Sequence, residues 1–276
     1  MSIDKYYRKA AFPAAILGLM ECNGILKLGG VFQKTYEASD TQNYLLGTRR
    51  ITWDGRVFKY AKAVGTLQCD YACKFVAGEL FEYVALGASQ VVGDKQVTLT
   101  VVAGKVVAED ELKGGYISIF KAGLGDSINR GITGNTALAA LGVSITIYLD
   151  EPLDRAVTVT ADHAEILPNP YRAVKDLQAS GCPDAYASVA GLPNVPATNG
   201  QFCWIQTWGI RWMSPTGNAT GGVAGERSVY FDTNGGVSEL TYTTSTLLNR
   251  QLAGFLVDAT SVGVDGCPFV MLQISM

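Results

Sequence analysis

The sequence predicts an all-β protein, an antiparallel β-sandwich or barrel of jelly-roll or tulip-like form, with an extended N-terminal arm. Short apolar runs alternate with polar residues, as they do in half-buried strands. Glycine and Asp/Asn clusters separate these runs at short intervals, which is typical of sandwiches and barrels. No long amphipathic helices alternate with the strands, so a parallel α/β sheet is not expected.

The composition fits a β protein that makes extensive contacts with other subunits. Charged residues are 17% of the 276 residues, below the roughly 25% of average proteins. Apolar residues are 48% of the chain, which argues against disorder. The net charge of −3 argues against a dedicated nucleic-acid-binding protein, which usually has a basic face.

Residues 1–48 predict the extended arm because they show no long hydrophobic period and mix apolar pieces with glycines and polar stretches. Basic residues precede an apolar run at 10–20, as in a signal peptide. Pro13 interrupts this run and no small-residue cleavage site follows, so export is not expected. No run is long enough to span a membrane.

Residues 49–63 predict a two-stranded hairpin with a two-residue Asp54-Gly55 turn. That turn would place Arg50 opposite Lys59, a like-charge pair that is destabilising on its own. The hairpin has a net charge of +4 in a chain of −3, so the remainder is −7. This imbalance indicates an acidic partner surface, on another subunit or another protein. The alternative is that solvent or the chain's own carboxylates satisfy the cations.

The candidate partner-binding residues all lie on this hairpin. They are Arg49, Arg50, Trp53, Arg56 and Lys59. In the predicted register Trp53 faces Arg56 beside the turn.

The rest of the chain divides into three further stretches. Residues 66–86 are ambiguous, and a short helix is allowed there although Gly78 weakens it. Within 90–172 we expect strands at 96–102, 116–121, 143–149 and 156–160. Residues 173–200 predict a connector without regular structure, because several prolines interrupt it. Residues 201–276 predict closing strands at 202–213, 228–231, 239–242, 254–257 and 269–274.

The strand at 202–213 is rich in aromatic residues. Trp204, Trp208 and Trp212 share parity and would line one of its faces. Their spacing also fits a helix, but Thr207 and Gly209 favour the strand. Such a face is most often core. A stacking platform for sugar rings and a subunit interface remain the alternatives.

No catalytic signature is present, so we do not expect an enzyme. The motifs G-x-S-x-G, P-loop and H-E-x-x-H are absent. The block 125–128, GDSI, resembles the nucleophile block of GDS(L) esterases. That family has this serine near the N-terminus and a D-x-x-H pair near the C-terminus, whereas His163, the only histidine, lies in mid-chain.

No metal or cofactor is expected either. The six cysteines include no C-x-x-C pair, so zinc-site spacing is missing. The acidic clusters 109–111 and 150–154 lie at predicted turns, where solvated charge is ordinary. A cation site and a pair of catalytic carboxylates flanking a sugar cleft are the alternatives for these clusters.

Several blocks in a fixed order resemble one known group of proteins. They are 47–63 (GTRRITWDGRVFKYAKA), 114–119 (GGYISI), 132–137 (ITGNTA), 145–156 (ITIYLDEPLDRA), 167–174 (LPNPYRAV), 202–209 (FCWIQTWG) and the ending 254–274. Over most of residues 47–276 the chain resembles virion structural proteins of tailed bacteriophages, of the kind encoded near the major capsid protein and taken to be capsid decoration, or cement, proteins.

The resemblance implies a non-enzymatic protein that binds the outside of the expanded head and stabilises it. Its partners would be the major capsid protein and copies of itself, as a homotrimer, with no direct contact to nucleic acid or membrane. It would be assembled in the bacterial host cytoplasm and lie on the capsid exterior. The alternative is a carbohydrate- or receptor-binding spike or fibre-base protein that uses the face of Trp204, Trp208 and Trp212.

Overall fold

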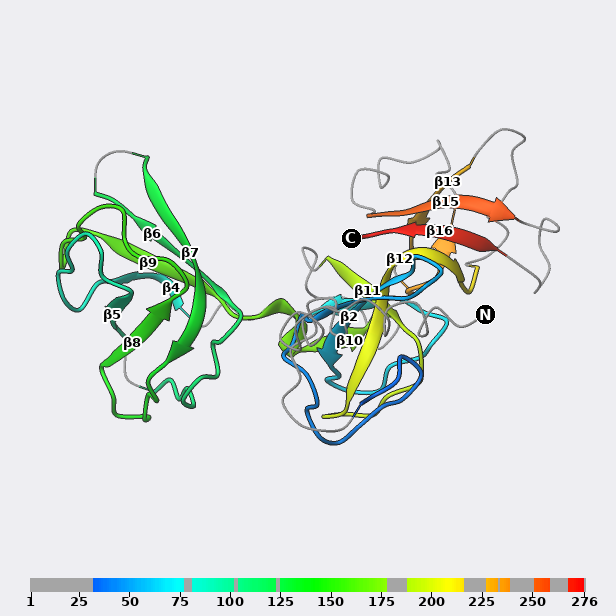
Figure 1. Cartoon of the computed structure of the whole chain (residues 1–276), viewed down its shortest axis with the longest axis horizontal. Helices are drawn as coiled ribbons and strands as arrows, with labels where there is room; N and C mark the ends of the chain where they lie inside the picture. The colour runs from blue at the N-terminus through cyan, green and yellow to red at the C-terminus, as the bar shows by residue number, and fades with distance from the viewer. Residues whose placement is uncertain are drawn as a thin grey trace, which may run out of the picture. The chain divides into compact units, whose positions relative to one another are not determined.

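The computed structural model describes residues 32–76, 81–101, 104–122, 125–177, 188–215, 227–232, 234–238, 251–258 and 268–275. Within these ranges the regular elements are antiparallel strands and one short 3-10 helix, η1 (Pro170–Arg172). The all-β prediction is therefore confirmed (Figure 1). The chain divides into two compact units, unit 1 with Met1–Phe75 and Ala173–Met276, and unit 2 with Val76–Arg172. The single β-rich body predicted for residues 49–276 is thus divided between these two units.

Unit 2 is a six-stranded sheet that curls until its two edges meet. Its strands are β4 (Phe81–Ala85), β5 (Gln96–Thr100), β6 (Tyr116–Phe120), β7 (Ser127–Asn135), β8 (Ser144–Leu149) and β9 (His163–Leu167). The order is β4-β9-β6-β7-β8-β5, and a bridge between Leu86 and Leu99 joins the two ends. One face of every strand enters a common core, which includes Val97, Ile119 and Ile147.

The alternating pattern predicted this unit well. The expected strands at 96–102, 116–121 and 143–149 are confirmed with slightly shorter bounds. The strand expected at 156–160 is wrong, since only Val157 makes an isolated bridge there. Thr160 has a φ of 64°, in the left-handed region, and the Asp162 carboxylate accepts the N–H of Thr158. The backbone therefore turns instead of pairing.

Unit 1 contains a ten-stranded sheet built around one long strand. Its strands are β1 (Arg49–Ile51), β2 (Val57–Lys62), β3 (Cys73–Phe75), β10 (Val174–Asp176), β11 (Val189–Pro193), β12 (Phe202–Trp212), β13 (Ser228–Phe231), β14 (Val237–Ser238), β15 (Leu252–Asp258) and β16 (Phe269–Gln273). The main path is β10-β3-β11-β12-β16-β15-β13-β14, and the β1–β2 hairpin joins it through β12. β12 thus pairs with β2, β11 and β16.

Most closing strands match their predictions, and two other stretches differ. The strand expected at 239–242 lies outside the described residues. The connector 173–200 is wrong in part, because it contains β10 and β11. All five residues of β11 are buried, so its sequence does not alternate between apolar and polar residues. Pro193 at its end also argued against a strand. In 66–86 the described residues form β3 and β4, so the short helix is not formed there.

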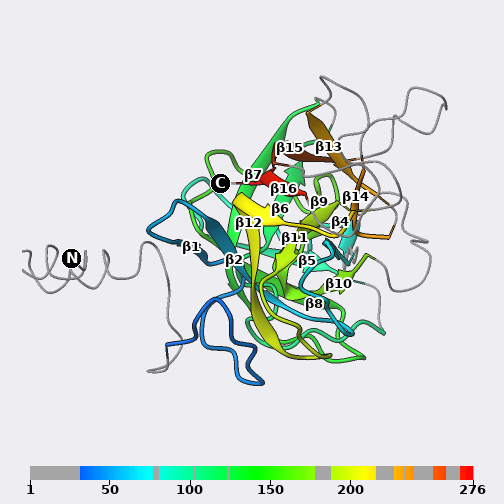
Figure 2. The same ribbon diagram turned by 90° about the vertical axis from the view of Figure 1, so that its right-hand side faces the viewer.

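The segment before the hairpin packs on unit 1, so the extended-arm prediction is wrong for residues 32–48. Ser39 bridges Phe202 at the start of β12, and Tyr44 is fully buried. Figure 2 shows this blue segment close to β2 and β12. The remainder of the predicted arm, residues 1–31, lies outside the described residues.

Gln33 holds this segment in place with all of its side-chain hydrogen-bonding capacity. Its Oε1 accepts hydrogen bonds from Tyr60 Oη at 2.6 Å and from Asn43 Nδ2 at 3.0 Å. Its Nε2 donates to the carbonyl oxygens of Glu37 at 2.7 Å and Phe202 at 2.8 Å. A buried amide satisfied in this way stabilises one conformation, because each bond would otherwise leave a buried polar group unpaired.

Candidate interaction surfaces

The predicted hairpin is present, but its turn has one more residue than expected. Thr52 N donates to Arg56 O at 2.9 Å, and Gly55 N donates to Thr52 O at 2.9 Å. The loop is therefore Trp53, Asp54 and Gly55. Gly55 has a φ of 82°, which corresponds to a type I turn followed by a left-handed glycine. The two-residue Asp54-Gly55 turn was wrong because this glycine closes the loop rather than occupying its centre.

The extra residue shifts the register by one. Arg49 now lies opposite Lys59, and Arg50 lies opposite Phe58. The like-charge pair is thus kept with a different arginine. Burial and the neighbouring Arg49 guanidinium lower the pKa of Lys59. In the isolated chain this pair is a repulsive contact.

Two of the five predicted partner-binding residues are engaged within unit 1. The Arg50 guanidinium donates to Gln33 O at 3.1 Å and lies 4.5 Å from the centroid of the Phe32 ring. Arg56 Nε lies 2.7 Å from Asp54 Oδ2. These guanidinium groups therefore help to position the segment at residue 32 and the hairpin loop.

Of the other three predicted residues, Trp53 and Arg49 face solvent, whereas Lys59 is partly buried in β2 between β1 and β12. Trp53 is 88% exposed at the loop, and Arg49 is exposed on the edge strand β1. Among the described residues, neither Arg49 nor Lys59 forms an ion pair with a carboxylate. We call Arg49, Trp53 and Lys59 the hairpin surface.

The predicted row of tryptophans on β12 has two different environments. Trp204 is fully buried against Tyr44 and Tyr60, at 5.1 Å and 5.0 Å between ring centroids. Trp208 and Trp212 are half-buried at the other end of the strand. The core interpretation therefore fits Trp204, whereas the other two rings remain accessible.

Trp208 and Trp212 belong to an apolar face that spans three neighbouring strands. Ile210 on β12 pairs with Met271 on β16, which pairs with Phe255 on β15, and Trp212 pairs with Phe269. Ile210, Phe255 and Phe269 are 52%, 42% and 43% exposed. We call Trp208, Ile210, Trp212, Phe255, Phe269 and Met271 the apolar face. The sequence contains a signal for an exposed apolar surface here, since the strands at 254–257 and 269–274 have apolar residues on both faces.

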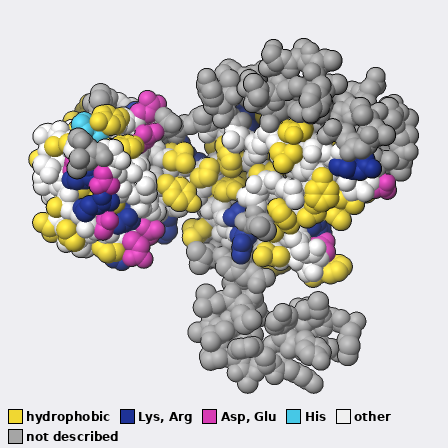
Figure 3. Space-filling view, turned by 90° about the horizontal axis from the view of Figure 1, so that it is seen from above, with side chains coloured by type: hydrophobic (Ala, Val, Ile, Leu, Met, Phe, Trp, Pro, Cys, Tyr) yellow, Lys and Arg dark blue, Asp and Glu magenta, His cyan; other side chains and the backbone are white. Residues whose placement is uncertain are grey.

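A groove of about 630 Å³ lies on the outside of the unit 2 barrel, over β6, β7 and β9. Its lining includes Tyr116, Arg130, Asp150, Glu151, Glu165 and Leu167. Tyr116 and Leu167 are 57% and 51% exposed, so the groove has accessible apolar walls beside its charges. Figure 3 shows Asp and Glu side chains (magenta) on the surface of unit 2, the unit that carries the single histidine (cyan).

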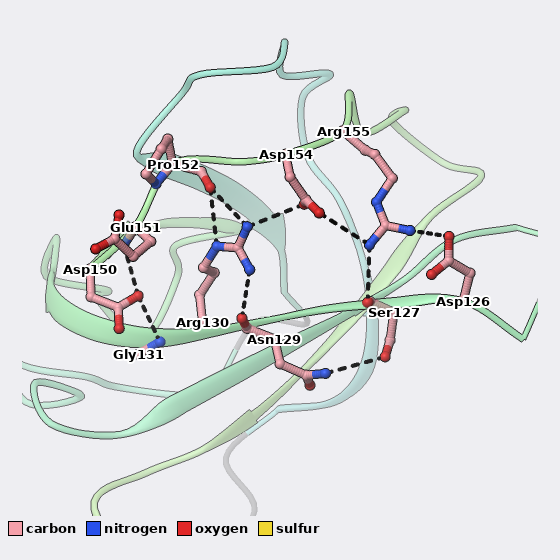
Figure 4. A network of polar contacts seen from close by, with 10 residues as sticks. All are labelled: Asp126, Ser127, Asn129, Arg130, Gly131, Asp150, Glu151, Pro152, Asp154 and Arg155. Atoms are coloured by element: carbon pink, nitrogen blue, oxygen red, sulfur yellow. Dashed lines mark hydrogen bonds and ion pairs between the residues drawn. The ribbon is translucent and has the colours of Figure 1, made fainter.

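Two charged side chains of the groove, Arg130 and Asp150, form hydrogen bonds within unit 2 (Figure 4). Arg130 donates to the carbonyl oxygens of Pro152 at 2.9 Å and Asn129 at 2.8 Å. Asp150 Oδ1 accepts the main-chain N–H groups of Gly131 and Glu151, at 2.9 Å and 2.8 Å. These interactions fix the loop beside the groove.

Two further carboxylates line the groove without such a contact. Neither Glu151 nor Glu165 forms an ion pair among the described residues. With Asp150 they exceed the single arginine of the lining, so the groove has an excess of negative charge.

The block resembling an esterase nucleophile does not assemble with the histidine. Ser127 on β7 pairs with Phe120 on β6, which pairs with His163 on β9. Phe120 therefore separates the hydroxyl from the imidazole by two strand spacings, about 10 Å. His163 stacks on Tyr83, with 4.3 Å between the ring centroids, and Asp126 pairs with Arg155.

The acidic clusters form ion pairs, and the described cysteines are free thiols. Glu111 pairs with Arg172, and Asp154 pairs with Arg130. Within the described ranges, no group of three or more His, Cys, Asp or Glu side chains is arranged to hold a metal ion. Cys69, Cys73 and Cys203 are free thiols; the other three cysteines lie outside the described residues.

No protein family, curated protein or solved structure matches this chain. No helix in the described part of the chain is long and apolar enough to cross a bilayer. The likeness of the sequence blocks to phage virion proteins therefore stays a prediction.

Proposed function

We propose that this chain is a capsid decoration protein, which binds the outer surface of a tailed-phage head and stabilises it through the apolar face of unit 1. The exposure of Ile210, Phe255 and Phe269 on adjacent strands carries this proposal. Contiguous apolar surface of this kind marks interaction sites in soluble proteins. The ordered sequence blocks support a phage head as the partner, with the major capsid protein as the chain that is bound.

Binding through this face requires no rearrangement of the strands that carry it. The opposite sides of β15 and β16 are anchored in a core that includes Leu256, Val270 and Met213, the residue directly after β12. A partner of matching shape would bury the exposed side chains and gain roughly 25 cal/mol for each Å² of apolar area removed from water. The apolar face is thus a rigid platform for another protein surface.

Binding of the chain to purified heads of its phage, measured by co-sedimentation, tests the proposal. Replacing Phe255 and Phe269 by Thr keeps β-forming residues but removes two exposed rings, so head occupancy is expected to fall strongly at unchanged melting temperature. Leu141→Thr, at an exposed apolar position of unit 2, is the matched control. Unaltered occupancy of the double variant would refute the apolar face as the binding surface.

A carbohydrate- or receptor-binding function is the second candidate, because Trp208 and Trp212 are accessible on the same face. Stacking on sugar rings would perturb the fluorescence of these tryptophans. The measurement is best made in a Trp53→Ser background, which removes the most exposed indole. A saturable change on titration with host cell-surface glycans would favour this candidate. A copy number in purified virions comparable with that of the major capsid protein would favour decoration.

A further inference from the structure

The two units carry net charges of opposite sign. Unit 2 contains 12 Asp and Glu against 7 Lys and Arg, a net charge of −5. Since the whole chain is −3, unit 1 is +2, and the hairpin 49–63 alone is +4. A protein with this distribution presents its own complementary surfaces when two copies meet in a head-to-tail arrangement.

The hairpin surface has the properties of a docking element. Arg49 and Lys59 repel one another across the strands and lack an ion pair among the described residues. Trp53 presents nearly its whole indole to solvent in the loop, four residues along the hairpin from Arg49. Tryptophan and arginine are the residue types that most often dominate binding energy at protein interfaces.

The groove of unit 2 has the complementary chemistry. Tyr116 and Leu167 offer apolar surface to an indole, and Glu151 and Glu165 offer carboxylates to cations. Arg130 does not oppose an incoming cation strongly, since its guanidinium is bound to carbonyl oxygens and to Asp154. The volume of about 630 Å³ lies within the range of clefts that enclose compact ligands, about 300–1,000 Å³.

We propose that the β1–β2 hairpin of one copy binds in the groove of unit 2 of a second copy. Trp53 then lies against Tyr116 and Leu167, and the two cations of the hairpin surface lie opposite the groove carboxylates. The repulsion between Arg49 and Lys59 is relieved, because each cation gains a carboxylate. The two surfaces are different, so the contact is heterologous and builds a ring or a chain of copies.

This contact goes beyond head binding, because it leaves the apolar face free. Copies bound to a head would be linked to one another laterally while each holds the capsid protein by a separate surface. The contact also requires no head, so it can be measured on the full chain alone.

The substitution Arg49→Glu tests the hairpin side. It replaces the like-charge pair with Lys59 by an opposite-charge pair, so the melting temperature is expected to stay equal or rise slightly. Self-association, measured by sedimentation velocity over a concentration series, is expected to weaken about tenfold or more. A residue with only a structural role would not lose association while gaining stability. Trp53→Ser is expected to weaken association about 30-fold.

The substitution Glu165→Lys tests the groove side and is expected to weaken self-association by a similar factor. Glu82→Lys is the matched control, since Glu82 is exposed in unit 2 and does not line the groove. A monomeric wild-type chain at every concentration would overturn the contact, as would equal effects of Glu165→Lys and Glu82→Lys. A non-associating Arg49→Glu variant that still binds heads would leave the decoration function standing.

Discussion

The barrel of unit 2 is filled by aliphatic side chains. In unit 1, the part of the sheet that residues 32–48 cover has a core of aromatic rings around the side-chain amide of Gln33. In unit 2, Val97, Ile119 and Ile147 represent the core, and Phe81 is the single aromatic residue among its described members. In unit 1, the rings of Tyr60 and Trp204 pack together and Gln33 supplies their polar partners.

The two regions also differ in how far apart in the sequence the residues in contact lie. The pairs β6–β7 and β7–β8 join consecutive strands of unit 2. The bond from Gln33 to Phe202 spans 169 positions in unit 1. Unit 2 therefore depends on generic burial, whereas the aromatic cluster of unit 1 depends in addition on a few directional hydrogen bonds that a single substitution can break.

The largest expected effect is that of Gln33→Leu. This change keeps side-chain bulk but leaves the buried partners of Gln33 without their hydrogen bonds. We expect a loss of about 4 kcal/mol in the unfolding free energy of unit 1, since each orphaned buried group costs about 1–3 kcal/mol. Urea unfolding followed by tryptophan fluorescence measures it, because all four tryptophans belong to unit 1.

The matched control for this change is Gln96→Leu, at an exposed position of unit 2. It should leave the tryptophan-reported transition unchanged. Equal curves for Gln33→Leu and Gln96→Leu would remove the claim that one amide anchors residues 32–48.

A cavity in the aliphatic core should affect unit 2 in the generic way. Ile147 is fully buried, so Ile147→Ala is expected to lower the unfolding free energy of unit 2 by about 3 kcal/mol. Hydrogen exchange of β5 and β8 amides measures the loss, and the tryptophan signal of unit 1 serves as the internal reference. A matching loss in the tryptophan transition would show that the two units do not unfold separately.

Acid should destabilise unit 2 through Asp162. Although burial alone would raise the pKa of this carboxyl, hydrogen bonds from Lys121 Nζ and the N–H groups of Thr158 and Ala122 hold the pKa below its ordinary value. A lowered pKa stabilises the fold above the unfolded pKa of about 3.9, and this stability is lost as the pH falls through the folded value.

The variant Asp162→Asn isolates this contribution. We expect it to cost about 2 kcal/mol at neutral pH and to reduce the slope of unit 2 stability against pH below about pH 4. Acid titration followed by amide exchange in β9 provides the measurement. An unaltered slope would mean that other carboxyls control the acid sensitivity.

Alkali should destabilise unit 1 through Tyr60. Burial raises the pKa of this phenol to about 12. A raised pKa gives stability that is complete below the unfolded pKa of about 10 and is lost as the pH rises towards the folded value. Tyr60→Phe is expected to cost about 1 kcal/mol at neutral pH and to flatten the alkaline decline. Unfolding detected by fluorescence between pH 8 and 12 provides the measurement. An equal decline in the stability of the wild type and of Tyr60→Phe would contradict this role of Tyr60.

The same contrast explains what the sequence could predict. Strands β5, β6 and β8 alternate strictly between buried and accessible residues, so their pattern is visible in any window of five. β11 is buried on both faces and has no such pattern. Gln33 is a single polar residue in a stretch without a period, and nothing local marks it as the centre of a network.

The interaction surfaces were predictable only in part. Charge and the turn residues indicated the hairpin, but the choice between a two-residue and a three-residue loop depended on Gly55, and it decided which arginine faces Lys59. The groove collects residues from four separated segments, 116–118, 129–131, 150–151 and 165–167. Each segment alone resembles part of an ordinary half-buried strand or turn, so only the curled sheet brings them together.

Mixing two variants, each defective in one surface, tests the contact between hairpin and groove most directly. Trp53→Ser keeps its groove and Glu165→Lys keeps its hairpin, and neither should associate alone at a concentration close to the wild-type dissociation constant. In an equal mixture the intact hairpin of the second binds the intact groove of the first, and assembly stops there. Light scattering should then report twice the 29.4 kDa of one chain. A mixture that stays at the mass of one chain would contradict the contact.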